Sequence, residues 1–101
     1  MNGTIALERQ SAPVALVKVS HEAKLNAFTM SMWEQLAETF EKLGADPSIR
    51  CIVLRCEGER AFSVGADIGE FAEHRRNKES ARNFQKLSHR AFKAVEAART
   101  P

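Results

Sequence analysis

The stretch Ala61–Ile68, AFSVGADI, contains the residues in this chain best suited to stabilising a developing negative charge. It follows an apolar run, Cys51–Leu54, that is typical of a buried strand. Gly65 and Ala66 are small enough for a tight turn, and Asp67 is a favoured helix N-cap. The N–H groups at a helix N-terminus attract anions. The pattern therefore indicates either half of an oxyanion hole or only a capped helix after a turn.

Few side chains have the spacing of a catalytic group. Asp67 and Glu70 lie at capping-box spacing, so we expect their carboxylates to bind backbone N–H groups rather than transfer protons. His89 falls on the polar side of an expected helix, and Ser63 has no Ser-His-Asp arrangement around it. We therefore assign no general acid, base or nucleophile.

Composition is typical of a globular protein, with 101 residues of which 44% are hydrophobic and 28% charged. The net charge of +2 is not gathered into a basic and aromatic stripe, so we do not expect nucleic acid as a partner. No apolar run is long enough to span a membrane, and the N-terminus lacks a secretory pattern. We therefore expect no membrane partner.

Cysteine and histidine placement predicts neither a disulfide nor a metal site. Cys51 and Cys56 lie five apart along one expected strand, so they point to opposite faces and cannot pair. His21, His74 and His89 are scattered over separate segments, without metal-ligand spacing. Reduced thiols indicate a cytoplasmic protein.

Two strands are expected first, at Thr4–Arg9 and Val14–Val19, forming a hairpin around the turn Ser11–Pro13. A helix should follow, with Ser31 as N-cap in a capping box with Glu34. Its apolar positions recur at helical spacing and predict a buried stripe of Trp33, Leu36, Ala37, Phe40 and Leu43. Gly44 occupies the expected C-terminal cap, before Asp46-Pro47.

A third strand at Cys51–Arg55 and two further helices complete the expected elements. The first of these helices runs from Ile68 to His74, and the second from Ser80 to Ala98. The basic segment His74–Glu79 between them is either a solvated connection or a phosphate contact. The last helix should bury one face, formed by Phe84, Leu87, Ala91, Phe92, Val95 and Ala98.

This order predicts an α/β fold with about three strands and three helices. The second and third strands should pair in parallel through a helical crossover. Such a sheet needs cover on both faces, and Pro101 follows a helix as if another element began there. We therefore expect residues 1–101 to be the front portion of a longer domain.

Four segments together resemble the enoyl-CoA hydratase/isomerase (crotonase) superfamily in order and spacing. They are Lys24–Ala27, the helix through Leu36 and Phe40, Asp46–Arg50, and Phe62–Ile68. The resemblance implies a crotonase-like (ββα)n spiral, of which residues 1–101 are the first repeats and the N-terminal part of a single domain, incomplete at its C-terminal end. It also implies a homo-oligomer, as a trimer or dimer of trimers, acting on acyl-CoA thioesters in fatty acid metabolism.

The resemblance also implies the roles of individual residues. The Ala66 N–H would be one of two backbone donors to the thioester oxygen, the charge of which grows when an enolate forms. Coenzyme A would enter as part of the substrate, with no metal and no tightly bound cofactor. The implied substrate-binding residues are Ala23, Lys24, Leu25, Val64, Ala66, Asp67, Ile68 and Gly69.

The chain departs from the family pattern in several places. Ser20–Glu22 replaces a common Asn-Arg-Pro turn, Val64 stands where alanine is frequent, and Gly69 stands where a basic residue is frequent. The glycine-rich turn that supplies the second amide, and the acidic residues of hydratases, are not found in this sequence. We therefore expect these 101 residues alone to be inactive, with a catalytically silent coenzyme A contact or assembly module as the alternative. Hydration, isomerisation, thioester hydrolysis, decarboxylation and dehalogenation all remain open.

Overall fold

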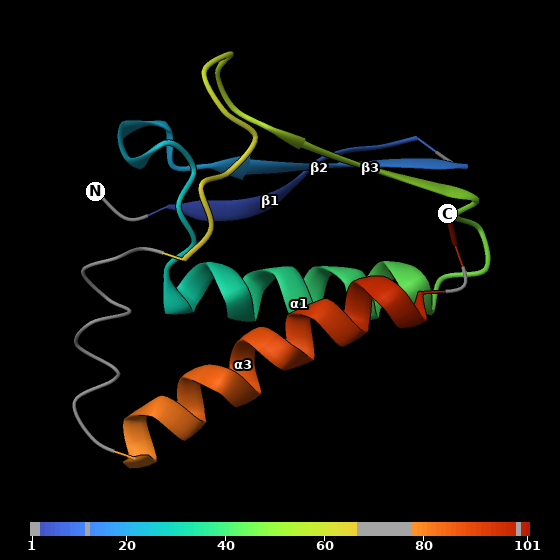
Figure 1. The fold of residues 1–101 in the computed structure, drawn as a ribbon. Coiled ribbons are helices and arrows are strands. Elements are labelled where there is room, and N and C mark those ends of the chain that lie inside the picture. The colour runs from blue at the N-terminus through green and yellow to red at the C-terminus, as the bar shows by residue number, and fades with distance from the viewer. Residues whose placement is uncertain (1–2, 12, 67–77, 99) are drawn as a thin grey trace.

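Three strands and two long helices form most of the part of the chain described by the computed structural model, which covers residues 3–11, 13–66, 78–98 and 100–101 (Figure 1). β1 (Thr4–Ser11) and β2 (Val14–Ser20) pair antiparallel, with a bulge in the register between Leu7 and Arg9. The expected hairpin is therefore confirmed.

The crossover after β2 places a third strand beside it. α1 (Met30–Gly44) leads to β3 (Cys51–Cys56), which pairs in parallel with β2 and gives the strand order β1-β2-β3. α1 covers one face of this sheet, and α3 (Lys78–Ala97) packs on the far side of α1 (Figure 1). The parallel crossover predicted from the sequence is confirmed, and the described elements form three layers.

The core lies between β2 and α1. Ala15, Val17 and Val19 alternate along β2 and are fully buried, because they all point toward α1. The predicted stripe of α1 is buried as expected, together with Met32, which the sequence analysis did not include. Burial of this amphipathic face is the main source of stability for a helix of this length.

The prediction for the last helix was partly wrong. Phe84 and Ala91 are buried, but Phe92 is 60% exposed and Val95 is 40% exposed, whereas Ala94 is buried instead. The contact of α3 with α1 follows positions spaced by three and four residues, a narrower stripe than the predicted face. Phe92 still meets the edge of the Trp33 ring at 5.2 Å between ring centroids.

The ends of α1 also differ from the expectation. Its N-cap is Thr29, not Ser31: the Thr29 hydroxyl accepts a hydrogen bond from the Met32 N–H at 3.2 Å. Ser31 instead accepts from the Gln35 side chain on the exposed surface. Gly44 is the last helical residue, and the cap is Ala45 in a right-handed conformation, so no left-handed glycine cap forms.

The remaining element predictions differ from the structure only at their ends or cannot be compared with it. β3 extends one residue beyond the expected strand, and α3 begins at Lys78 and ends at Ala97. Asp67, Glu70 and the helix expected over Ile68–His74 lie outside the described residues.

Candidate functional site

Two loops meet at one edge of the sheet because β2 and β3 are parallel. The carboxyl ends of parallel strands lie at the same edge, so the loop of residues 21–28 after β2 and the loop of residues 57–66 after β3 begin side by side (Figure 1). The Val64 N–H donates to the Leu25 carbonyl at 3.3 Å, and the Phe28 N–H donates to the Gly65 carbonyl at 2.6 Å. The structure thus brings together two segments that the sequence analysis predicted to bind the same substrate.

The Ala66 N–H points away from this loop contact. In a trans peptide, the carbonyl of one residue and the N–H of the next point in opposite directions. The Gly65 carbonyl faces the Phe28 N–H, so the Ala66 N–H faces the other side. Within the described part of the chain this N–H donates to no acceptor. It is therefore a backbone donor available to a ligand.

The residues around Ala66 determine this geometry. Gly65 has a φ of +97°, a left-handed conformation that glycine adopts without strain. Ala66 itself is half-buried against the apolar core and forms an isolated parallel bridge with Phe28, whose ring lies 4.5 Å from that of Trp33. The turn is thus anchored to the N-terminal end of α1.

The loop over Ala23–Leu25 is a single turn of 3₁₀ helix, η1 (Glu22–Lys24), followed by Leu25 in the left-handed conformation. The Leu25 N–H closes the turn on the Glu22 carbonyl at 2.9 Å. Ala23 and Lys24 are exposed, and Leu25 is half-buried. This arrangement presents the Lys24 ammonium and the backbone of the turn to solvent, where an anionic ligand has access.

The structure places Ser63 between the two loops and His89 on the surface of α3. The Ser63 hydroxyl donates to the Asn26 carbonyl at 2.7 Å and accepts from the Gly65 N–H at 3.1 Å. It therefore joins the two loops. His89 is exposed on α3. Asp67, Ile68 and Gly69, which were predicted to bind substrate, lie outside the described residues.

Asn26 is the residue that the sequence analysis missed. It is 1% exposed, has a φ of +58°, and donates from its side chain to the carbonyls of Glu57 and Ala61. Its place in the segment Lys24–Ala27 was noted only for the family resemblance. A polar residue between Leu25 and Ala27 was the available signal, but its partners are more than thirty residues away in the sequence.

The shifted pKa values belong to groups outside this loop contact. Burial raises the pKa of the Cys56 thiol, and the hydrogen bond from the Arg90 guanidinium lowers the pKa of Glu41 on the exposed surface between α1 and α3.

Cys51 and Cys56 are both free thiols, so the prediction that they do not pair is confirmed. No group of His, Cys, Asp and Glu among the described residues could hold a metal ion. No helix in that same part is long and apolar enough to cross a membrane.

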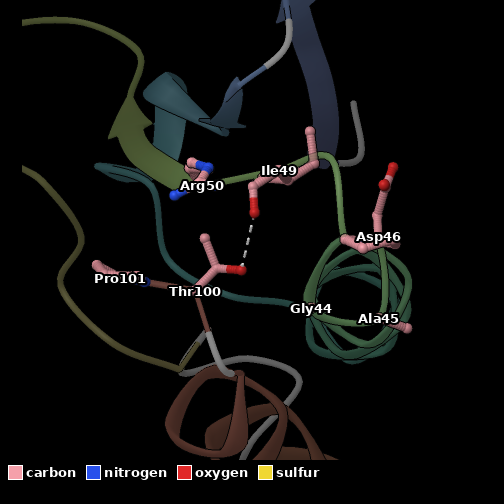
Figure 2. Close-up of a pocket in the computed structure, with 8 residues that line it drawn as sticks. Gly44, Ala45, Asp46, Ile49, Arg50, Thr100 and Pro101 are labelled. Carbon is pink, nitrogen blue, oxygen red and sulfur yellow. Dashed lines mark hydrogen bonds between the residues drawn. The ribbon is translucent and has the colours of Figure 1, made fainter.

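A separate pocket of about 450 Å³ lies at the opposite end of α1 (Figure 2). The turn after α1 and the last two residues line it, and the Thr100 hydroxyl donates to the Ile49 carbonyl at 3.3 Å. α1 has 15 residues and is about 22 Å long, which separates this pocket from the Ala66 turn. None of the predicted site residues lines the pocket.

Comparison with known proteins shows which family this chain resembles. The model of the family described as enoyl-CoA hydratase/isomerase matches residues 9–97. Carboxymethylproline synthase from Pectobacterium carotovorum subsp. carotovorum is 29% identical over 66 residues, which are 65% of this chain and 26% of that protein. A probable enoyl-CoA hydratase from Bacillus subtilis (strain 168) is 34% identical over 61 residues, covering 60% of this chain and 23% of that protein.

Solved structures show the same similarity. An enoyl-CoA hydratase/carnithine racemase from Magnetospirillum magneticum superposes with a TM-score of 0.84 at 37% identity, over 91% of this chain and 34% of that one. An enoyl-CoA hydratase from Bacillus anthracis gives a TM-score of 0.85 at 23% identity, over 97% of this chain and 37% of that one, and shows the shared fold. The described elements therefore form the α/β arrangement of part of a crotonase fold. The chain spans about a quarter of the curated relatives and about a third of the structures.

Proposed function

Because this chain belongs to the enoyl-CoA hydratase/isomerase family, we propose that the full-length protein processes acyl-CoA thioesters and stabilises a thioester enolate with backbone amides. The Ala66 N–H is one of these amides. The observation that carries the proposal is the direction of this N–H, which faces away from the loop of residues 21–28 and has no acceptor among the described residues.

The chemistry follows from the charge on the thioester oxygen. Removing a proton from the carbon beside the thioester carbonyl, or adding a nucleophile to the β-carbon of an enoyl thioester, places negative charge on that oxygen, and a fixed N–H stabilises the charge without reorganising. One such donor contributes about a hundred- to a thousandfold in rate. The second donor and the acid–base groups would come from parts of the protein outside residues 1–101, which by this proposal are the N-terminal portion of a single domain.

Substrate binding is proposed for the two loops that meet at the Ala66 turn. The exposed turn Ala23–Leu25 would lie along the adenine and pantetheine parts of coenzyme A, mainly through its backbone. Val64 would lie near the acyl group, together with the segment Asp67–Gly69. The resemblance further supports a homo-oligomer, a trimer or dimer of trimers, that acts as a lyase or isomerase on fatty acyl thioesters, and the free thiols of Cys51 and Cys56 support a cytoplasmic location.

The test is binding and turnover by the full-length protein. Titration calorimetry with free coenzyme A and with a 2-enoyl-CoA should show saturable binding of both, and the conjugated absorbance of the enoyl thioester should decay with time. The matched control is the same enoyl group on N-acetylcysteamine, which lacks the nucleotide and should bind much more weakly. Absence of coenzyme A binding would refute the proposal, whereas binding without turnover of any acyl thioester would favour the silent module.

A further inference from the structure

We propose that Asn26 is a positioning residue that fixes the Ala66 amide relative to the Ala23–Leu25 turn. The catalytic meaning of this role rests on the function proposed above. Asn26 itself need not touch the substrate, because its side chain is buried and is directed toward protein groups.

The side chain of Asn26 joins both candidate loops. Its Nδ2 donates to the Glu57 carbonyl at 2.9 Å and to the Ala61 carbonyl at 3.2 Å, both in the loop after β3. Its Oδ1 accepts from the His21 N–H at 2.9 Å, at the start of the loop after β2. One carboxamide therefore makes three hydrogen bonds, two of them to the loop after β3 and one within the loop after β2.

The backbone of Asn26 continues the connection to Ala66. Its carbonyl accepts from the Ser63 hydroxyl at 2.7 Å, and that hydroxyl accepts from the Gly65 N–H at 3.1 Å. The Gly65 carbonyl then accepts from the Phe28 N–H. Both polar groups of Gly65 are thus held: its carbonyl holds the peptide plane that carries the Ala66 N–H, and its own N–H holds the preceding plane.

The residue type at position 26 follows from these contacts. The backbone has a φ of +58°, which asparagine tolerates better than most residues with a side chain. The two carbonyls need N–H donors, which an aspartate carboxylate of the same shape lacks. Asn26→Asp would therefore keep the backbone preference while placing an oxygen against two carbonyl oxygens.

Hydrogen exchange in the full-length protein without ligand tests the positioning directly. In Asn26→Asp, we expect amides in residues 57–66 to exchange about tenfold faster or more, because buried hydrogen bonds are lost, while amides of α1 keep their wild-type rates. Asn83→Asp, an exposed site on α3 with the same charge change, is the matched control and should exchange like wild type. Unchanged exchange in 57–66, or equally faster exchange throughout α1, would overturn the proposal.

A spectroscopic readout links the position of the amide to its use. An aryl-conjugated acyl-CoA should absorb at longer wavelength when its thioester oxygen is hydrogen-bonded, and Asn26→Asp should lose at least half of the wild-type shift at saturating ligand. A full shift in the folded variant would overturn the role of Asn26. If wild type binds this thioester without a shift, the proposed function fails, and the exchange experiment still decides the positioning role.

A milder variant covers the case in which Asn26→Asp does not fold. Ser63→Ala removes one hydroxyl from the connection between the Asn26 carbonyl and the Gly65 N–H. We expect exchange at Gly65, whose N–H loses its acceptor, to be faster by about threefold or more, with no change in α1. Wild-type exchange at Gly65 in Ser63→Ala would refute the connection.

Discussion

Replacing Ala66 with proline tests the proposed oxyanion donor most directly. Proline removes the N–H and leaves the carbonyl of the preceding Gly65 in place to accept from Phe28. The bridge to α1 can therefore persist in Ala66→Pro. Because the Ala66 N–H has no acceptor among the described residues, its loss breaks no hydrogen bond within that part of the fold.

The expected loss is large because the two preceding amides cannot replace this donor. The Val64 N–H is bound to the Leu25 carbonyl, and the Gly65 N–H is bound to the Ser63 hydroxyl. Removing one oxyanion donor costs about 2.7–4 kcal/mol of transition-state stabilisation, so kcat should fall about a hundred- to a thousandfold. Ground-state binding of the coenzyme A portion should change little, because that part is proposed to lie on the other loop.

The assay compares kcat and coenzyme A affinity in wild type, Ala66→Pro and Ala66→Gly, each checked for native assembly. Glycine retains the N–H, so Ala66→Gly should keep most of the activity. Replacing Ala66 with lactic acid, which exchanges the N–H for an ester oxygen and keeps the methyl group, separates loss of the donor from the proline ring. A folded ester variant with wild-type kcat would refute the role of the amide.

Other properties of the structure give shorter tests. Thr29→Ala should cost about 0.5–2 kcal/mol in urea unfolding through loss of the N-cap, and Thr29→Ser should recover most of it. The raised pKa of Cys56 means that folding favours its neutral thiol, so alkylation should stay slow until the pH exceeds the pKa of a free thiol, about 8.5. The stability contributed by this group is present below that pKa and should be lost as pH rises through the higher pKa of the folded protein. The lowered pKa of Glu41 gives the opposite dependence of stability on pH. The stabilisation from this carboxylate is present above the unfolded pKa and is lost as pH falls through the folded pKa, and Glu41→Gln should remove this pH dependence of stability. The isolated 101-residue chain should sediment as an aggregate or unfold without a sharp transition, because it exposes large apolar side chains; a monomer with a cooperative transition would contradict this.

The sequence predicted those features of the fold that depend on a regular pattern of many residues. The apolar spacing of α1 and the order of strand, helix and strand gave the buried stripe and the parallel crossover, because both depend on many residues at once. The N-cap was mistaken because Ser31 with Glu34 matched a capping box, whereas Thr29 has no glutamate partner. In the structure the Thr29 hydroxyl accepts from the Met32 N–H, and the helix begins at Met30.

The candidate site was predicted from the sequence only in part. The family resemblance identified both loops, and their contact follows from the parallel pairing of β2 and β3. The role of Asn26 could not be obtained in the same way. Its partners Glu57 and Ala61 follow it by 31 and 35 residues, and no local pattern indicates which carbonyls a buried amide will meet.

The register between β2 and β3 connects the apolar core to the candidate site. Val19 pairs with Cys56, so the chain enters the second loop at Glu57, whose N–H donates to the Val19 carbonyl at 2.8 Å. A slip of one residue would move that loop by about 3.3 Å, more than a hydrogen bond between Asn26 and the Glu57 carbonyl can accommodate. It would also turn the core-facing side chains of β3 toward the opposite face of the sheet. Packing beneath the sheet therefore sets the position of the Ala66 amide through the strand register, and the Asn26 hydrogen bonds then hold it.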